Sequence, residues 1–230
     1  LSNYILDPIR FNNNSILRIS ETEELEESMT YQSLGTAIHN ALEELYEPYV
    51  GKELTIGCLE KMLENHKEIL TIHFEKKLGK DSHKTGKNLL IFTASAYSIK
   101  RVIEADIKDI VGGSMIELLG LEEYRKITRT YAGIEHPISF HGVIDRIDRK
   151  DGVLRILDYK TGKTEPKELC PKEISDCLSD AAFSKAFQVM FYSMLWAEDN
   201  QSSPFKAGVI SVKNMSAGVL YLTLGTDTKR

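Results

Sequence analysis

The sequence has few cysteines, no long apolar run and no excess of basic residues, and each shortage excludes a class of protein. Cys58, Cys170 and Cys177 have no CxxC spacing, so a zinc or iron–sulfur site is not expected and reduced thiols in a cytoplasmic protein are the simplest interpretation. No stretch approaches the roughly 18 consecutive apolar residues of a membrane helix. The formal net charge of −5 argues against a surface that coats DNA throughout, but it leaves room for a local basic groove.

The remaining composition is that of an ordinary globular protein. The chain has 230 residues, of which 42% are hydrophobic and 27% charged, enough for one substantial core. We expect a single domain over residues 1–230, with a mainly helical part at 1–112 and a sheet core at 113–230. The first residue is Leu1 rather than methionine, so we expect a fragment of a longer polypeptide.

Hydrophobic periodicity divides the chain into helices followed by strands. Apolar residues recur at helical spacing over 31–46, 53–78, 87–111 and 181–196. After residues 112–113 the pattern changes and predicts strands over 115–121, 124–131, 209–212 and 218–224, in addition to a hairpin within 141–163. Pro8 breaks a short helix expected within residues 1–17, and the acidic run at 21–27 is interpreted as a solvated segment. This order predicts an α/β (α+β) fold with a central mixed sheet flanked by helices.

The hairpin within 141–163 is the most informative stretch. Asp151-Gly152 is the dipeptide that best suits a two-residue type I′ turn, because both central residues need positive φ. In that register Lys150 faces Val153, and counting outward places Asp145 opposite Asp158. The Cβ atoms of opposed residues lie roughly 4.5–5.5 Å apart, and like charges at that distance are destabilising. The two carboxylates therefore need a neutralising partner.

The second strand of the hairpin carries the chemistry on a largely apolar surface. Both of its faces are apolar, which predicts a central strand, and Asp158 and Lys160 lie on the same face. Buried charges are costly unless they are paired or bound to metal. Two carboxylates beside an ammonium suit a hard divalent cation and a phosphate. The alternatives are that Asp145, Asp158 and Lys160 form a structural ion-pair cluster, or that a shifted turn leaves them in solvent.

Other polar residues lie where they can join this site, although none identifies it alone. His39 lies beside the apolar stripe of the first long helix, where a lone histidine is more often a packing residue than a ligand. Glu122 and Glu123 separate the two strands before the hairpin, and the choice between them is open. Gln188 and Tyr192 are four residues apart, so they project from one side of the last helix and are either helix surface or contacts to a substrate backbone.

Together these segments resemble the PD-(D/E)XK nuclease superfamily. The resemblance is carried by Gly-Thr-Ala-Ile-His39, Gly-Val-Ile-Asp145-Arg-Ile-Asp, Asp158-Tyr-Lys160-Thr-Gly-Lys and Gln188-Val-Met-Phe-Tyr192, in this order. It is closest to the RecB-like branch found in bacterial helicase-nucleases and spans nearly the whole chain, since residues 1–11 resemble the opening of these domains. It implies a restriction-endonuclease-like core with an N-terminal helical subdomain.

The resemblance also implies a role for each residue of the site. Asp145, Asp158, His39 and the backbone carbonyl of Tyr159 are implied ligands of Mg²⁺ or Mn²⁺. Lys160 is implied to orient or activate the attacking water and to stabilise charge on the phosphate. The implied activity is metal-dependent hydrolysis of DNA, without sequence specificity, by a nuclease that is linked to or associated with a helicase in repair and recombination. An exonuclease is expected, in the cytoplasm.

Gln188 and Tyr192 are implied to position nucleic acid near the site, and Glu122, Glu123 and Lys163 are further candidates. The chain departs from many members of this branch in one respect. These proteins carry a cysteine before the early proline and a cysteine triplet near the end, which hold an iron–sulfur cluster. Here Asp7 precedes Pro8 and no cysteine follows Cys177, so no cluster is expected.

Two rival functions remain open at this stage. A nuclease-like fold that only binds DNA or protein would be indicated by loss of a site carboxylate or lysine, but all of these residues are retained. A metal-dependent hydrolase of small phosphoesters would cleave mononucleotides as well as polynucleotides. The sequence does not reveal cleavage polarity or a preference for single or double strands.

Overall fold

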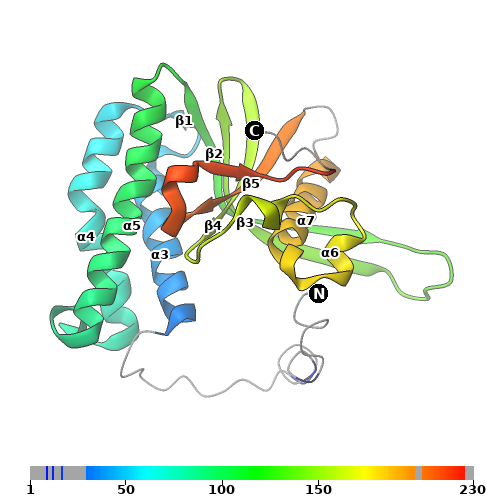
Figure 1. Ribbon diagram of the computed structural model, residues 1–230, viewed down its shortest axis with the longest axis horizontal. Coiled ribbons are helices and arrows are strands. Elements are labelled where there is room, and N and C mark those ends of the chain that lie inside the picture. The colour runs from blue at the N-terminus through cyan, green and yellow to red at the C-terminus, as the bar shows by residue number, and fades with distance from the viewer. Residues whose placement is uncertain (1–8, 10–11, 13–16, 18–29, 200–203, 226–230) are drawn as a thin grey trace.

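A computed structural model describes residues 9, 12, 17, 30–199 and 204–225. Three long helices come first, followed by a sheet that is interrupted by the last helices (Figure 1). The helices are α3 (Tyr31–Tyr46), α4 (Ile56–Leu78), α5 (Gly86–Val111), α6 (Asp176–Ser179) and α7 (Ser184–Asp199). The strands are β1 (Lys52–Glu53), β2 (Ile116–Arg129), β3 (Ile138–Lys150), β4 (Val153–Lys160), β5 (Phe205–Ser211) and β6 (Val219–Tyr221).

The six strands form one mixed sheet in the order β1-β2-β3-β4-β5-β6. Among the strands of the described residues, only β4 and β5 pair in parallel, because α7 lies in the crossover between them. One apolar core lies between the sheet and α3, α4 and α5, and a second lies between the sheet and α7. The fold is therefore a sheet covered by helices on both faces, as the sequence predicts, and β4 is a central strand.

The first helical layer forms close to its predicted bounds. Helix α3 begins after Thr30, whose side chain accepts a hydrogen bond from the Ser33 amide, and Thr55 caps α4 in the same way. The predicted helix at 31–46 matches α3, while residue 53, the first of the predicted second helix, lies in β1 instead. Within the described residues, no helix is both long and apolar enough to cross a membrane.

The turn between β3 and β4 confirms the predicted hairpin. Asp151 and Gly152 have φ values of 51° and 80°, which is what a type I′ turn requires. Lys150 pairs with Val153, and the ladder continues in this register to Arg146 and Leu157. Asp145 lies one residue beyond the last pair. The regular ladder therefore ends where the two predicted site carboxylates begin.

The prediction of two strands divided at Glu122-Glu123 is wrong, because β2 is one strand that passes through this point. Glu122 has a φ of 44°, and the pairing with β3 passes from Leu121 and Arg146 directly to Glu123 and Ile144. Leu121 packs on the α3–α5 side of the sheet, whereas Ile144 packs on the α7 side. At Glu122 the faces that the β2 and β3 side chains present are therefore exchanged. Glu122 and Asp145 do not form a backbone pair there, and their side chains approach each other.

The remaining differences lie at element ends. The predicted helix at 181–196 divides into a short 3-10 helix and α7, and the predicted strands at 209–212 and 218–224 correspond to β5, which begins earlier, and to the shorter β6. The segment between β4 and α7 contains 3-10 turns and α6. The helix predicted within 1–17, the acidic run at 21–27, and Asp7 with Pro8 lie outside the described residues.

Candidate active site

His39 reaches the sheet from the middle of α3. Its Nε2 lies 3.0 Å from the carbonyl oxygen of Tyr159, while its Nδ1 lies 3.5 Å from Asp145 Oδ2 and 3.8 Å from Glu122 Oε1. An Nε2–H that donates to the carbonyl fixes the ring and leaves the Nδ1 lone pair facing the two carboxylates. Burial lowers the pKa of His39, but Glu122 and the charge of Asp145 outweigh burial and leave the pKa raised.

Asp145 lies at the point where β3 and β4 separate. Its side chain is 7% exposed, and Oδ2 accepts a hydrogen bond of 2.7 Å from the amide of Tyr159. The backbone amide of Tyr159 in β4 is thus bonded to the carboxylate of Asp145 instead of to a carbonyl of β3. Burial, together with the negative charge of Asp158, raises the pKa of Asp145 to about 7. A cation beside this carboxyl would oppose the shift, because positive charge favours the ionised form.

Asp158 and Lys160 form a chain of polar contacts with α7. Lys160 Nζ lies 2.8 Å from Asp158 Oδ2 and donates a 2.6 Å hydrogen bond to Gln188 Oε1. Gln188 Nε2 in turn donates to the hydroxyl of Tyr192 at 2.7 Å. Burial raises the pKa of Asp158, and the charge of Lys160 offsets this only in part. Asp158 and Gln188 thus hold the ammonium group of Lys160 beside the cluster, and Tyr192 holds Gln188.

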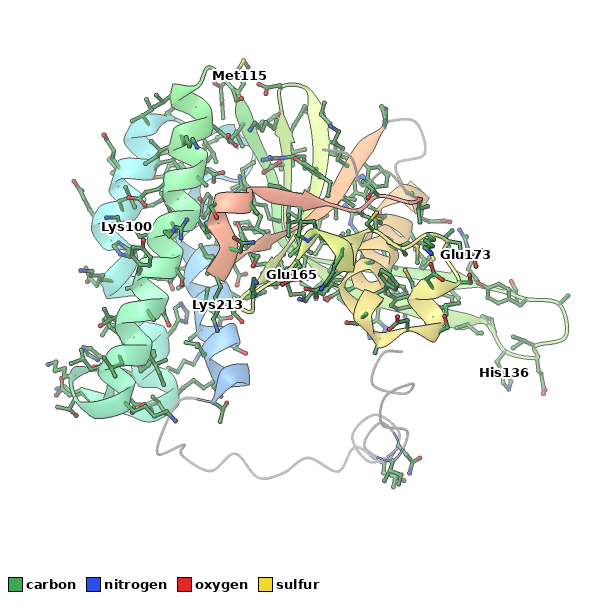
Figure 2. All side chains as sticks on the ribbon, viewed as in Figure 1. Lys100, Met115, His136, Glu165, Glu173 and Lys213 are labelled. Atoms are coloured by element: carbon green, nitrogen blue, oxygen red, sulfur yellow. The ribbon has the colours of Figure 1, made fainter. Side chains whose placement is uncertain are left out.

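The side chains of the two adjacent glutamates of β2, Glu122 and Glu123, have different partners. Glu122 lies in the cluster with His39 and Asp145, whereas Glu123 accepts a hydrogen bond from Arg125 Nη2 at 2.5 Å. Adjacent side chains of a strand already point to opposite faces, and the positive φ of Glu122 marks the place where the alternation along β2 is interrupted. Lys163 lies away from the cluster: it is exposed and pairs with Glu165, which Figure 2 labels.

The donor set suits a hard divalent cation. One ligand atom each from His39, Glu122 and Asp145 lie within 4.8 Å of one another. Next to them, the buried Oδ2 of Asp158 has an ion-pair contact with Lys160 but no hydrogen bond of normal geometry. Carboxylate oxygens with one imidazole are ligands that Mg²⁺ and Mn²⁺ accept. The residues present therefore fit such an ion.

Gly142 contributes a contact that the sequence reasoning missed. A Cβ built on Gly142 would lie 3.1 Å from Tyr192 Cε1 and 3.1 Å from Leu195 Cδ1. The missing side chain lets α7 approach the β3 backbone three residues before Asp145. A glycine inside a strand is a known sign of such close approach, so the signal was available.

One family model matches almost the whole chain. The model of the PD-(D/E)XK nuclease superfamily aligns with residues 1–229. The comparison with curated proteins gave no match.

Proposed function

The chain belongs to the PD-(D/E)XK nuclease superfamily, and from this membership we propose that it is a metal-dependent deoxyribonuclease that hydrolyses phosphodiester bonds. One observation carries the proposal. His39, Glu122 and Asp145 converge within 4.8 Å of one another, from α3, β2 and β3, beside the Asp158–Lys160 pair. A cation site beside a fixed ammonium group is suited to the hydrolysis of an anionic ester, because both groups stabilise negative charge on the phosphate.

His39, Glu122 and Asp145 would hold Mg²⁺ or Mn²⁺, with Asp158 next to them. When bound, such an ion lowers the pKa of a coordinated water and offsets negative charge on the phosphate. The chain's own residues prepare the site for this chemistry. The Tyr159 carbonyl accepts from His39 and so fixes the imidazole, and its role as a metal ligand, which the resemblance implies, stays a prediction.

Lys160 is the residue that we assign to the phosphate. Gln188 and Asp158 hold its ammonium group, and Tyr192 holds Gln188. The side chain of Lys160 is a quarter exposed, so its ammonium group can donate to a phosphate oxygen at the surface while its charge is only partly screened. This arrangement supports positioning of the scissile phosphate by Lys160 and orientation of the lysine by Gln188 and Tyr192.

Several finer features belong to the same proposal. We assign the protein to the RecB-like branch and to exonucleolytic degradation of DNA alongside a helicase, in repair or recombination, because the order of its motifs resembles that branch. We also assign it to the cytoplasm, since Cys58, Cys170 and Cys177 are free thiols. Neither residue 7 nor the residues after Cys177 supply cysteine ligands for an iron–sulfur cluster.

The test is a cleavage assay on end-labelled linear DNA and on circular DNA, with Mg²⁺, Mn²⁺ and chelator in parallel. We expect cleavage only with metal, and loss of cleavage in Asp158→Ala with an unchanged circular dichroism spectrum. Degradation of linear DNA alone would support an exonuclease. Metal-dependent hydrolysis of mononucleotide esters at the rate of DNA would instead favour a small-phosphoester hydrolase.

A further inference from the structure

The hairpin of β2 and β3 beyond Glu122 has two unlike faces. From Glu123 and Ile144 to Arg129 and Ile138 the ladder is regular, so side chains alternate between the faces. In Figure 1 this part of the hairpin extends past the helices, and Figure 2 places His136 at its outer end. We call the side that packs on α7 the inner face and the opposite side the outer face.

The inner face is occupied by α7. Phe140 contacts Phe191 with ring centroids 6.2 Å apart, and the Arg125 guanidinium lies 4.8 Å from the centre of the Trp196 ring. The arginines on this face meet carboxylates: Arg125 pairs with Glu123, and Arg129 pairs with Glu198. The inner face therefore holds the hairpin onto the domain, and its charges are used within the protein.

The outer face is open and has a different composition. Its residues come from alternate positions of the two strands and are Tyr124, Lys126, Thr128, Ser139, His141 and Val143. No carboxylate is among them, although the chain as a whole has a net charge of −5. Tyr124 is 59% exposed, and its ring lies 6.0 Å from that of His141 at an interplanar angle of 35°. Lys126 pairs directly with His141 across the ladder and is also exposed.

The outer face leads into the candidate active site. Tyr124 follows Glu122 by two residues, a distance of about 7 Å along a strand. The side chains of His39 and Glu122 are 26% and 28% exposed, so the candidate metal ligands are accessible from the surface. The outer face and the candidate site are therefore adjacent along β2.

We propose that the outer face binds an unpaired nucleic-acid strand, whose bases stack on Tyr124 and His141 while Lys126 contacts a phosphate. The proposal rests on the proposed function and adds a substrate class to it. Exposed aromatic rings beside a cation favour single strands, because every unpaired base offers a free ring face. Bases in a duplex are already stacked on their neighbours and offer no such face. The surface therefore selects ends or regions with unpaired bases.

Equilibrium binding in chelator separates this inference from catalysis. The probe is a short single-stranded oligodeoxynucleotide that carries 2-aminopurine and a terminal fluorophore. We expect Tyr124→Ala to weaken binding roughly 5- to 150-fold, the range for loss of one stacked base, and to remove quenching of the 2-aminopurine. Tyr124→Phe keeps the ring and should bind like the wild type. Tyr97→Ala is the matched control, because Tyr97 is also 59% exposed but lies on α5.

The outcomes of this experiment test the binding surface separately from the nuclease activity. Equal affinity in Tyr124→Ala and the wild type, or no binding of the oligonucleotide by the wild type, overturns the stacking surface even where the protein cleaves DNA. Loss of affinity in Tyr124→Ala supports the surface even where no cleavage is found, which would then count against the nuclease alone. An equal loss for blunt duplex, or a dimer that Tyr124→Ala dissociates, also overturns the proposal.

Discussion

Two groups of buried or partly buried charged residues adjoin each other in β3 and β4, and their charges are arranged in opposite ways. In the first, which we call the balanced cluster, Arg146 joins Asp106 of α5 to Asp148, and Arg155 makes two further hydrogen bonds to Asp148. Tyr46 also donates to Asp106 at 2.7 Å. Two carboxylates thus meet two guanidinium groups, and Arg146 and Asp148 have no exposed surface.

The second group, which we call the site cluster, contains three carboxylates and one ammonium group. Glu122, Asp145 and Asp158 lie beside Lys160, and His39 is the remaining member. Burial and like charge raise the pKa of both aspartates, and one oxygen of Asp158 lacks a hydrogen bond. The site cluster therefore carries an excess of negative charge that a divalent cation would neutralise.

The contrast bears on the alternative that Asp145, Asp158 and Lys160 are only a structural ion-pair cluster. Buried charges that hold a fold together are paired and hydrogen-bonded, because each unpaired ion costs several kcal/mol. The balanced cluster meets this requirement one residue away from Asp145. A protein that balances four buried charges so completely, and leaves the next group unbalanced, supports a functional reason for the imbalance.

The largest expected effect is on the balanced cluster. Arg146→Met leaves Asp106 and Asp148 buried without their shared partner, and we expect the free energy of unfolding to fall by about 3–5 kcal/mol. Urea denaturation followed by circular dichroism measures it. Arg149→Met is the control, since Arg149 pairs with Glu117 at the surface and its loss should cost about 0–1 kcal/mol. Equal effects of the two changes would contradict the distinction drawn here.

Removing the ammonium group of the site cluster should lower the rate of DNA cleavage. We expect Lys160→Ala to lower this rate by roughly 10²–10³, the usual cost of losing one electrostatic stabiliser. Lys163→Ala provides the comparison, because Lys163 is exposed and pairs with Glu165. Single-turnover cleavage of a labelled oligonucleotide measures both variants. A similar loss of rate in Lys163→Ala would return that residue to the site.

Metal should stabilise the protein through the site cluster alone. With Mn²⁺ at 100 times its Kd, binding to the folded state adds about 2.7 kcal/mol to the free energy of unfolding. We expect Glu122→Gln to weaken Mn²⁺ binding in a calorimetric titration and Glu123→Gln to leave it unchanged, because only Glu122 faces His39 and Asp145. Equal titrations for the two variants would remove Glu122 from the ligand set.

The sequence predicts most of the site cluster, but it predicts neither the place of Glu122 nor the balanced cluster. Asp151-Gly152 fixes a turn, the turn fixes a register, and the register leads to Asp145, Asp158 and Lys160. The place of Glu122 depends on a positive φ at a residue other than glycine, which no local signal in the sequence predicts.

The balanced cluster was missed for a different reason. It requires Asp106, which lies 40 residues before Arg146 and reaches it only when α5 packs on the sheet. Periodicity identifies strands and faces, but contacts between distant segments depend on how the layers pack.

The smallest expected effect has the opposite sign to the first. In chelator, Asp145→Asn removes one negative charge from a cluster that has too many, and the amide oxygen can still accept the hydrogen bond from Tyr159. We therefore expect the free energy of unfolding to rise, by up to about 1 kcal/mol for relief of opposed like charges, while cleavage with Mg²⁺ is lost. Urea denaturation with and without Mn²⁺ measures the change. Asp148→Asn should do the reverse and destabilise the protein, because Asp148 is already matched by two arginines. A metal-free Asp145→Asn protein that is as destabilised as Asp148→Asn would show that both clusters hold the fold, and the argument from excess charge would fail.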